Sequence, residues 1–371
     1  MKKYAAKILS LVLCVSLVSA CLTPAYAAAA GERVSLAQYT DYANRLIPEL
    51  SRLPDANLPE AGLSLSQPLE ILNDNDDTNY AFFLFHENTC VGELVVTRLG
   101  GEFAASFLAA ELPQVSAAYA QEVPVCLVSE ARALLLCSDA GTEVIVGELD
   151  QDAGVLRANA AQAVAVQIRK EPLTLTPAES VETVQRTGLP SSSKTLPVGF
   201  VENARVDGDG ICWAAATASI IGYLKNQKSL DAISVYEAMV HRLGKRPVLG
   251  YRENVGLAFI NYEITHYTGL EGSLSFSDVM NSINMNYPIY MSLAGTIVIN
   301  GKTEDAFHGV AICGYKNESD YTDYYQVMDP NYRYGKVWIT VNRNTNSFTY
   351  PTSGWGTYTR WRWSVHSYYV N

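Results

Sequence analysis

The chain has 371 residues, of which 48% are hydrophobic, and a formal net charge of −11. This length exceeds that of one typical domain and predicts two, with enough apolar residues for packed cores. The negative charge argues against nucleic acid as a partner and against electrostatic binding to anionic membranes.

The N-terminus has the pattern of a secretory signal peptide. Lys2, Lys3 and Lys7 precede an apolar run over residues 8–18, and this run is too short to span a membrane. The small-x-small sequence that ends at Ala27 is typical of a signal-peptidase cleavage site. We therefore expect residues 1–27 to be a signal peptide and the mature protein to be secreted.

A second processing pattern ends at Cys21. The sequence Val18-Ser-Ala-Cys21 resembles a bacterial lipobox, whose cysteine would be lipidated and would anchor the protein at the cell surface. We favour cleavage after Ala27. No later stretch is long and apolar enough to span a bilayer, so we expect no transmembrane segment after the signal peptide.

Residues 28–170 are expected to form a separate N-terminal domain of the antiparallel α+β class. Apolar residues at helical spacing predict an amphipathic helix over residues 36–50. The chain then becomes strand-like between turn residues. The expected strands are 80–85, 90–97, 103–107, 123–128, 133–137 and 143–146, with a short helix over 113–121. This region contains no catalytic constellation.

Residues 171–197 are rich in Pro, Ser, Thr and Glu and lack sustained periodicity. This composition predicts a linker, which is the natural place for a domain boundary or a protease nick.

The cysteines are few and widely spaced. Five of the seven remain if Cys14 and Cys21 are removed with the signal peptide. An odd number outside the cell predicts at least one unbridged thiol. Because there is no CxxC spacing and no disulfide-dense pattern, burial rather than bridges should hold the fold together.

Residues 198–371 are expected to form a second α+β domain, with helices first and an antiparallel sheet after them. The predicted helices cover 212–224, a segment from Ser229 or Asp231 to Leu243, and 277–286. The predicted strands are 289–293, 297–299, 308–315, 324–328 and 336–341, followed by further strands in an aromatic-rich tail.

Cys212 follows a Gly/Asp-rich turn and begins the first of these helices. Small residues recur along one face at three- and four-residue spacing, so another element can pack close to that face. The unpaired N–H groups and the dipole at a helix N-terminus favour a thiolate. The position suits a nucleophile, whereas the alternative is a small buried residue at the start of a core helix.

Two further residues complete a candidate constellation. His308 is expected to begin a strand, with Gly309 giving close access beside it, and Asp329 ends the next strand just before a proline. Adjacent antiparallel strands bring such residues together. We expect Asp329 to accept a hydrogen bond from His308 Nδ1 and to leave Nε2 facing the Cys212 thiol, which gives a nucleophile, a base and an orienting group.

The motifs Cys212-Trp-Ala-Ala, His308-Gly-Val-Ala-Ile-Cys-Gly-Tyr315 and Val327-Met-Asp-Pro-Asn331 resemble, in this order, the papain-like cysteine peptidases, and most closely the bacterial C39-like and staphopain types. The resemblance covers roughly residues 198–371. It implies a papain-like fold, a peptide or protein substrate, a Cys-His-Asp triad and no cofactor. The N-terminal region resembles more loosely the propeptides of streptopain-like enzymes, which implies a zymogen whose own N-terminal domain inhibits it within the same chain.

The chain departs from this family's pattern before the cysteine. The family has a glutamine there that donates into the oxyanion hole, and residues 198–211 contain none. Asn203 is the nearest amide donor and our candidate for that role. Asp207 and Asp209 are expected to raise the pKa of a nearby thiol. Asn331 is an alternative to Asp329 as the orienting residue.

The same residues allow other interpretations besides the triad. A zinc site from Cys212, His308 and Cys313 is disfavoured, because positions 308 and 313 point to opposite faces of a strand, so no metal is expected. The missing glutamine favours a catalytically weak or inactive papain-fold surface-binding or immunity module. An acyl-transfer enzyme of the same fold is a further alternative.

Overall fold

The computed structural model describes residues 34–59, 61–72, 79–99, 102–130, 133–139, 141–147, 170–177, 192–247, 252–299, 302–317, 322–332, 336–342, 347–348, 350–352 and 356–367. The chain forms two compact units, Met1–Gln38 and Tyr39–Asn371, and nearly all described residues belong to the second. The predicted signal peptide and Cys21 lie outside the described residues. Within these ranges no helix is both long and apolar enough to cross a membrane.

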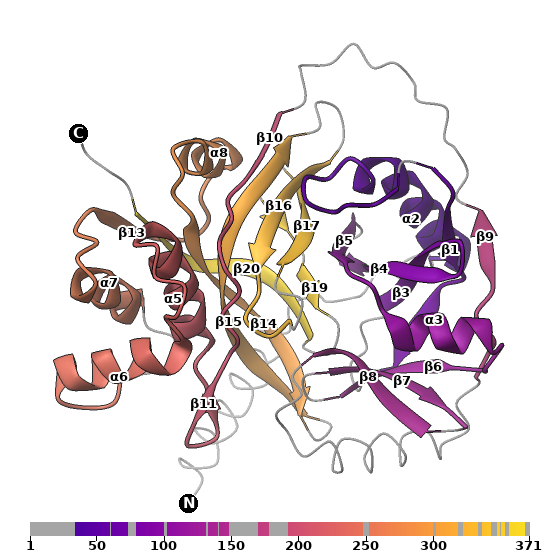
Figure 1. Cartoon of the computed structure of the whole chain (residues 1–371), viewed down its shortest axis with the longest axis horizontal. Coiled ribbons are helices and arrows are strands. Elements are labelled where there is room, and N and C mark those ends of the chain that lie inside the picture. Colours follow the sequence, from indigo (N-terminus) through magenta and orange to yellow (C-terminus); the bar gives the residue numbers. More distant parts are fainter. Residues whose placement is uncertain are drawn as a thin grey trace, which may run out of the picture. The chain divides into compact units, whose positions relative to one another are not determined.

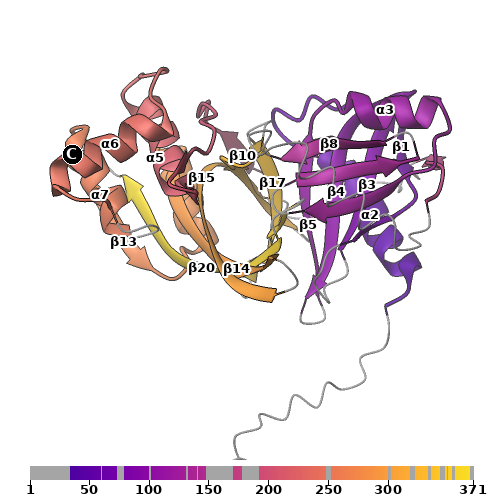
Figure 2. The same cartoon turned by 90° about the horizontal axis from the view of Figure 1, so that it is seen from below.

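The first half of the described chain is a mixed α+β arrangement (Figures 1 and 2). Its elements are α2 (Leu36–Leu50), β1 (Leu63–Ser66), β2 (Leu69–Leu72), β3 (Asn79–His86), β4 (Thr89–Leu99), β5 (Glu102–Ala109), α3 (Pro113–Ala120), β6 (Cys126–Glu130), β7 (Ala133–Ser138), β8 (Gly141–Gly147) and β9 (Leu175–Pro177). The expected helix at 36–50 and the expected hairpin of β3 and β4 are both present. The sheet is not wholly antiparallel, because β2 pairs in parallel with β6.

The second half contributes the remaining elements. They are β10 (Ser192–Thr195), β11 (Arg205–Val206), β12 (Asp209–Gly210), α5 (Cys212–Leu224), α6 (Ala232–Leu243), α7 (Arg252–Asn261), β13 (Tyr267–Glu271), α8 (Phe276–Asn284), β14 (Ile289–Ile299), β15 (Lys302–Asn317), β16 (Asp323–Met328), β17 (Lys336–Asn342), β18 (Ser347–Phe348), β19 (Tyr350–Thr352) and β20 (Gly356–Ser367). Antiparallel pairing gives the order β13–β20–β14–β15–β16–β17.

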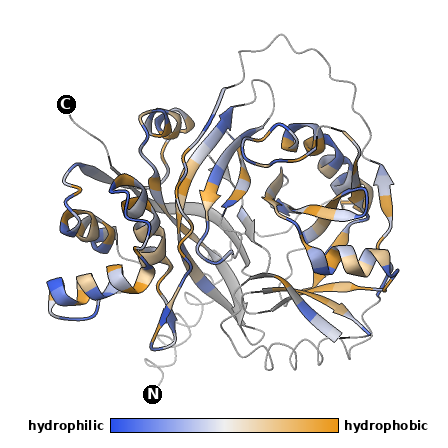
Figure 3. Ribbon diagram, in the orientation of Figure 1, coloured by the Kyte–Doolittle hydropathy of each residue, from blue (hydrophilic) through white to orange (hydrophobic). Residues whose placement is uncertain are grey.

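Helix α5 is the buried centre of this half. Its residues from Trp213 to Ile221 are all buried, as expected for a helix that is apolar on every side. It packs against β15 and β14 on one side and against α6 and α7 on the other, and Figure 1 shows these helices gathered beside the strands. In Figure 3 hydrophobic colour appears on both strands and helices, whereas the tip of the β11–β12 hairpin is hydrophilic.

The sequence pattern does not predict helix α7. Its buried residues Val255, Ala258 and Phe259 have helical spacing, but the segment is short and contains Gly256, which lowers helix propensity. A Cβ at position 256 would lie 2.8 Å from the Tyr267 ring. The glycine is therefore required by packing against β13, which the local sequence does not reveal.

The predicted linker 171–197 contains two short strands at its described ends. β9 pairs with β1, and β10 pairs with β15. Such pairing is made by backbone groups, so polar side chains do not prevent it, and a composition-based prediction misses it. The expected domain boundaries remain a prediction.

The two halves of the described chain meet along β5 and β17. Trp338 pairs with Phe107, and Thr340 Oγ1 contacts the backbone N and O of Ala105 at 3.0 and 3.3 Å. Nearby, the Tyr324 hydroxyl donates to Glu49 Oε2 at 2.6 Å. One hydrogen-bonded strand network therefore contains strands from both halves.

Candidate active site

A tight hairpin positions Cys212. Asp207 and Gly208 have φ angles of 54° and 91°, which fits the Asp-Gly turn favoured in two-residue hairpins. After β12 the Ile211 N–H donates to Ala204 O at 2.9 Å, and α5 begins at Cys212. The N-cap residue Ile211 makes no side-chain capping bond. The partial positive charge of the first N–H groups is therefore not neutralised by a cap and favours a thiolate at Cys212.

His308 lies within β15 rather than at its start, because the strand begins at Lys302. The longer strand is explained by its pairing with β14 along Ile289–Ile299. The next residue, Gly309, donates its backbone N–H to Cys212 Sγ at 3.4 Å. A Cβ at position 309 would lie 3.0 Å from the Trp213 Cα and closer still to the Tyr290 hydroxyl. Glycine is therefore needed for α5 to approach β15 this closely.

His308 and Asp329 are both buried and in direct contact. His308 Nε2 lies 2.7 Å from Asp329 Oδ1, so the expected use of Nδ1 for the carboxylate is wrong. Asp329 follows the end of the neighbouring strand β16. Nε2, the ring nitrogen farther from the His308 backbone, is the one that reaches its carboxylate. His308 also forms a side-chain hydrogen bond with Cys212, and Nδ1 is the ring nitrogen that Asp329 does not contact.

Asp329 accepts two further hydrogen bonds. The backbone N–H of Asn331 donates to Oδ1 at 2.9 Å, and the hydroxyl of the buried Tyr350 donates to Oδ2 at 2.7 Å. Both carboxylate oxygens are thus held in place, one of them facing His308. The sequence does not single out Tyr350, because no spacing distinguishes it from the other aromatic residues of the C-terminal tail.

The two asparagines with predicted roles lie together beside this contact. Asn331 Nδ2 is 3.3 Å from both ring nitrogens of His308. The contact between His308 and Asp329 is shorter, at 2.7 Å, and this favours Asp329 as the orienting residue. Asn203 Nδ2 donates to Asn331 Oδ1 at 2.8 Å. This contact uses one of the two Nδ2 protons, and the oxyanion role of Asn203 stays a prediction.

The environment of the thiol favours a charged pair. Burial by itself would raise the pKa of Cys212, but the hydrogen bond and charge of His308, with the Gly309 N–H, lower it below its ordinary value of 9.0. Burial also opposes a cation at His308, yet Asp329 and Cys212 raise its pKa from 6.5 to about 10. Both shifts favour a thiolate beside an imidazolium.

Asp207 and Asp209 were expected to raise the pKa of the thiol, but the pKa of Cys212 is lowered. Asp207 forms an ion pair with Arg246, and the carboxylate that opposes the Cys212 thiolate is instead Asp329. The effect of Asp329 is outweighed, because the His308 cation lies between it and the sulfur.

Cys313 belongs to a different environment from Cys212. It is buried, and its sulfur contacts Gln326 Oε1 at 3.4 Å. Among the described residues no group of three or more His, Cys, Asp or Glu side chains is placed to hold a metal ion.

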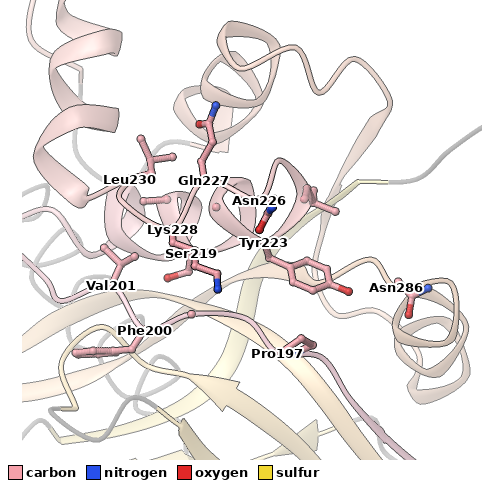
Figure 4. A pocket seen from close by; sticks show the side chains of 14 residues that line it. Pro197, Phe200, Val201, Ser219, Tyr223, Asn226, Gln227, Lys228, Leu230 and Asn286 are labelled. Atoms are coloured by element: carbon pink, nitrogen blue, oxygen red, sulfur yellow. The ribbon is translucent and has the colours of Figure 1, made fainter.

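A hollow of about 690 Å³ lies beside the C-terminal half of α5 (Figure 4). Phe200 and Val201 line one side of it, and Ser219 and Tyr223 line the other. Tyr223 is eleven residues from Cys212, or roughly 16 Å along a helix. Cys212 and His308 do not line this hollow, so its position does not associate it with their chemistry.

Comparison with known proteins bears on the second half of the chain. No curated protein matches the chain. The mixed α+β architecture, with one large sheet network and six described helices, is compatible with a papain-like fold. Residues 195–355 match the model of the Peptidase_C39 like family, and this similarity supports a place for that part of the chain in the papain-like cysteine peptidase superfamily.

Proposed function

We propose that this protein is a cysteine peptidase that hydrolyses peptide bonds with Cys212 as nucleophile, His308 as acid and base, and Asp329 as the orienting group. The family similarity of residues 195–355 suggests a cysteine-peptidase-like function. The observation that carries the proposal is the thiol of lowered pKa beside an imidazole that lies 2.7 Å from a buried carboxylate.

The proposed reaction has two stages. The Cys212 thiolate attacks the carbonyl carbon of the scissile bond, and the His308 imidazolium gives its proton to the leaving amine, which leaves a thioester. Neutral His308 then takes a proton from water, which attacks the thioester and releases the acid product. The backbone N–H of Cys212 and the Asn203 side chain are the proposed donors to the oxyanion.

Hydrolysis of a denatured protein substrate tests this proposal. We expect cleavage by the natural chain and its loss in Cys212→Ala. Cys313→Ala is a matched control, since it removes another cysteine of the same half of the chain, and it should retain cleavage. Equal cleavage by the natural chain and Cys212→Ala would overturn the proposal.

A second candidate is a catalytically weak or inactive papain-fold binding or immunity module. The absence of glutamine from residues 198–211 favours it, and the pKa shifts that favour a thiolate–imidazolium pair oppose it.

Acyl transfer is a third candidate, which would proceed through the same thioester. Adding a primary amine separates the three: amide product indicates transfer, hydrolysis alone indicates a peptidase, and neither indicates a binding module.

We also propose that the protein is exported and made as a zymogen whose N-terminal domain inhibits it. The support is the signal-peptide pattern of residues 1–27 and the protease-sensitive composition of residues 171–197. Mass spectrometry of the culture supernatant should find a chain that begins at Ala28 and a shorter active form that begins near Val198. Full activity in an uncleaved chain would contradict the zymogen.

A further inference from the structure

Cys126 and Cys137 lie directly opposite each other in the first half of the chain. The antiparallel register of β6 and β7 pairs Cys126 with Cys137 and the next residue, Leu127, with Leu136. Opposite residues of an antiparallel pair share one face of the sheet, so the two sulfurs are on the same side. Neither cysteine is in a disulfide in this structure.

The two thiols are in contact and shielded from solvent. Cys126 is 5% exposed and Cys137 is fully buried. The hydrogen bond between the two thiols is the largest cause that raises the pKa of Cys126. The Thr142 hydroxyl also contacts Cys137 Sγ, at 3.7 Å.

The other described cysteines have different neighbours. Cys90 Sγ contacts Gly92 O at 3.5 Å, and Cys313 Sγ contacts Gln326 O at 3.6 Å. Cys212 contacts the backbone N–H of Gly309. The register therefore distinguishes Cys126 and Cys137 as a pair.

We propose that Cys126 and Cys137 form an oxidation site, a cross-strand dithiol that closes to a disulfide. Opposite residues in an antiparallel pair have Cα atoms about 4.5–5.5 Å apart, within the 4.4–6.8 Å that a disulfide spans. The register therefore places the two Cα atoms within the separation that a disulfide spans. This inference does not depend on the proposed peptidase function.

The chemistry is thiol–disulfide exchange with glutathione disulfide or another small disulfide as oxidant. One thiolate attacks a sulfur of the oxidant, forms a mixed disulfide and releases one thiolate. The second cysteine, as its thiolate, then attacks the sulfur of the first and releases the other thiolate. In sum, the protein loses two protons and two electrons, and the oxidant gains them as two thiols.

Burial determines when this bond forms. The raised pKa of Cys126 keeps it protonated in the folded chain, and exchange requires the thiolate. The bond therefore forms while the β6–β7 hairpin is still accessible during folding. After folding, burial protects the bond from reductants.

The sequence allows a direct test by peptide mapping. Arg132 lies between the two cysteines, so trypsin places Cys126 in peptide 99–132 and Cys137 in peptide 133–157. The full chain is refolded in a buffer of reduced and oxidised glutathione, alkylated under denaturing conditions and digested without reductant. We expect the two peptides joined, with a mass two hydrogens below their sum. Alkylation of both cysteines on separate peptides would overturn the proposal.

Four controls make the result specific. Cys90→Ser should keep the linked peptides, whereas Cys126→Ser should abolish them. The same oxidation in concentrated urea gives the level of random pairing, which the refolded chain should exceed. Addition of reductant to the folded, oxidised chain should open the link more slowly than addition in urea. A link from Cys126 to any other cysteine, or a yield no greater than in urea, would contradict the assignment.

Discussion

The close approach of α5 to β15 at Gly309 makes Gly309→Ala the most informative single substitution. The added Cβ would lie 3.0 Å from the Trp213 Cα, whereas carbon atoms prefer about 3.5–4.0 Å. The helix must therefore retreat by roughly 0.5 Å, and overpacking of this kind costs about 1–3 kcal/mol of unfolding free energy.

The same retreat would weaken the contact between the Gly309 N–H and Cys212 Sγ, which already spans 3.4 Å. A hydrogen bond to a charged group contributes about 1.5–3 kcal/mol, and one pKa unit corresponds to about 1.4 kcal/mol. Losing most of this contact should raise the pKa of Cys212 by about one unit. At a pH below the pKa of Cys212 in both forms, the thiolate fraction falls tenfold per pKa unit, so alkylation by iodoacetamide should slow by about tenfold.

Gly314→Ala is the matched control for this experiment. It lies on the same strand, and its Cβ would be 3.0 Å from the Lys194 carbonyl oxygen, but its surroundings do not include Cys212. Urea unfolding should show a loss of stability in both variants, and peptide mapping should show slower alkylation only in Gly309→Ala. Equal alkylation rates in the two folded variants would refute the reasoning.

Three further substitutions test other contacts. Tyr350→Phe removes one hydrogen bond from the buried Asp329 and should lower the free energy of unfolding by about 1.5–3 kcal/mol in urea titration; unchanged stability would contradict this. Asn203→Ala should lower kcat by about 10²–10³-fold at similar KM if it donates to the oxyanion, and an unchanged kcat would exclude that role. Thr340→Val removes both contacts to Ala105 and should speed hydrogen exchange in β5 more than in β14, whereas equal effects would contradict the described junction.

Local patterns predicted most of the elements near the candidate site. The apolar run after Cys212 predicted α5, and Asp231 caps α6 through the Ser234 N–H at 2.7 Å, as its sequence position suggested. Glycine at 309 was expected to give close access, and the structure supplies the reason in Trp213 and Tyr290. These predictions depend on neighbours in sequence, where spacing carries the information.

Contacts between distant segments could not be predicted in this way. The hydrogen bond from Tyr350 to Asp329 joins the end of β16 to β19, and no periodicity relates the two. The ring nitrogen that faces Asp329 depends on how far β16 extends beside β15. The pKa of Cys212 depends on which charges lie nearest in space, and Asp207 is directed to Arg246.

The pH dependence of Cys212 alkylation tests the thiol–imidazole pair most directly. The pKa of Cys212 is lowered from 9.0 and that of His308 is raised to about 10. The thiolate should therefore persist, and alkylation should continue, at pH values well below 9.0. His308→Gln removes the cation, so its profile should move to higher pH. Superimposable profiles for the natural chain and His308→Gln would contradict the pairing of Cys212 with His308.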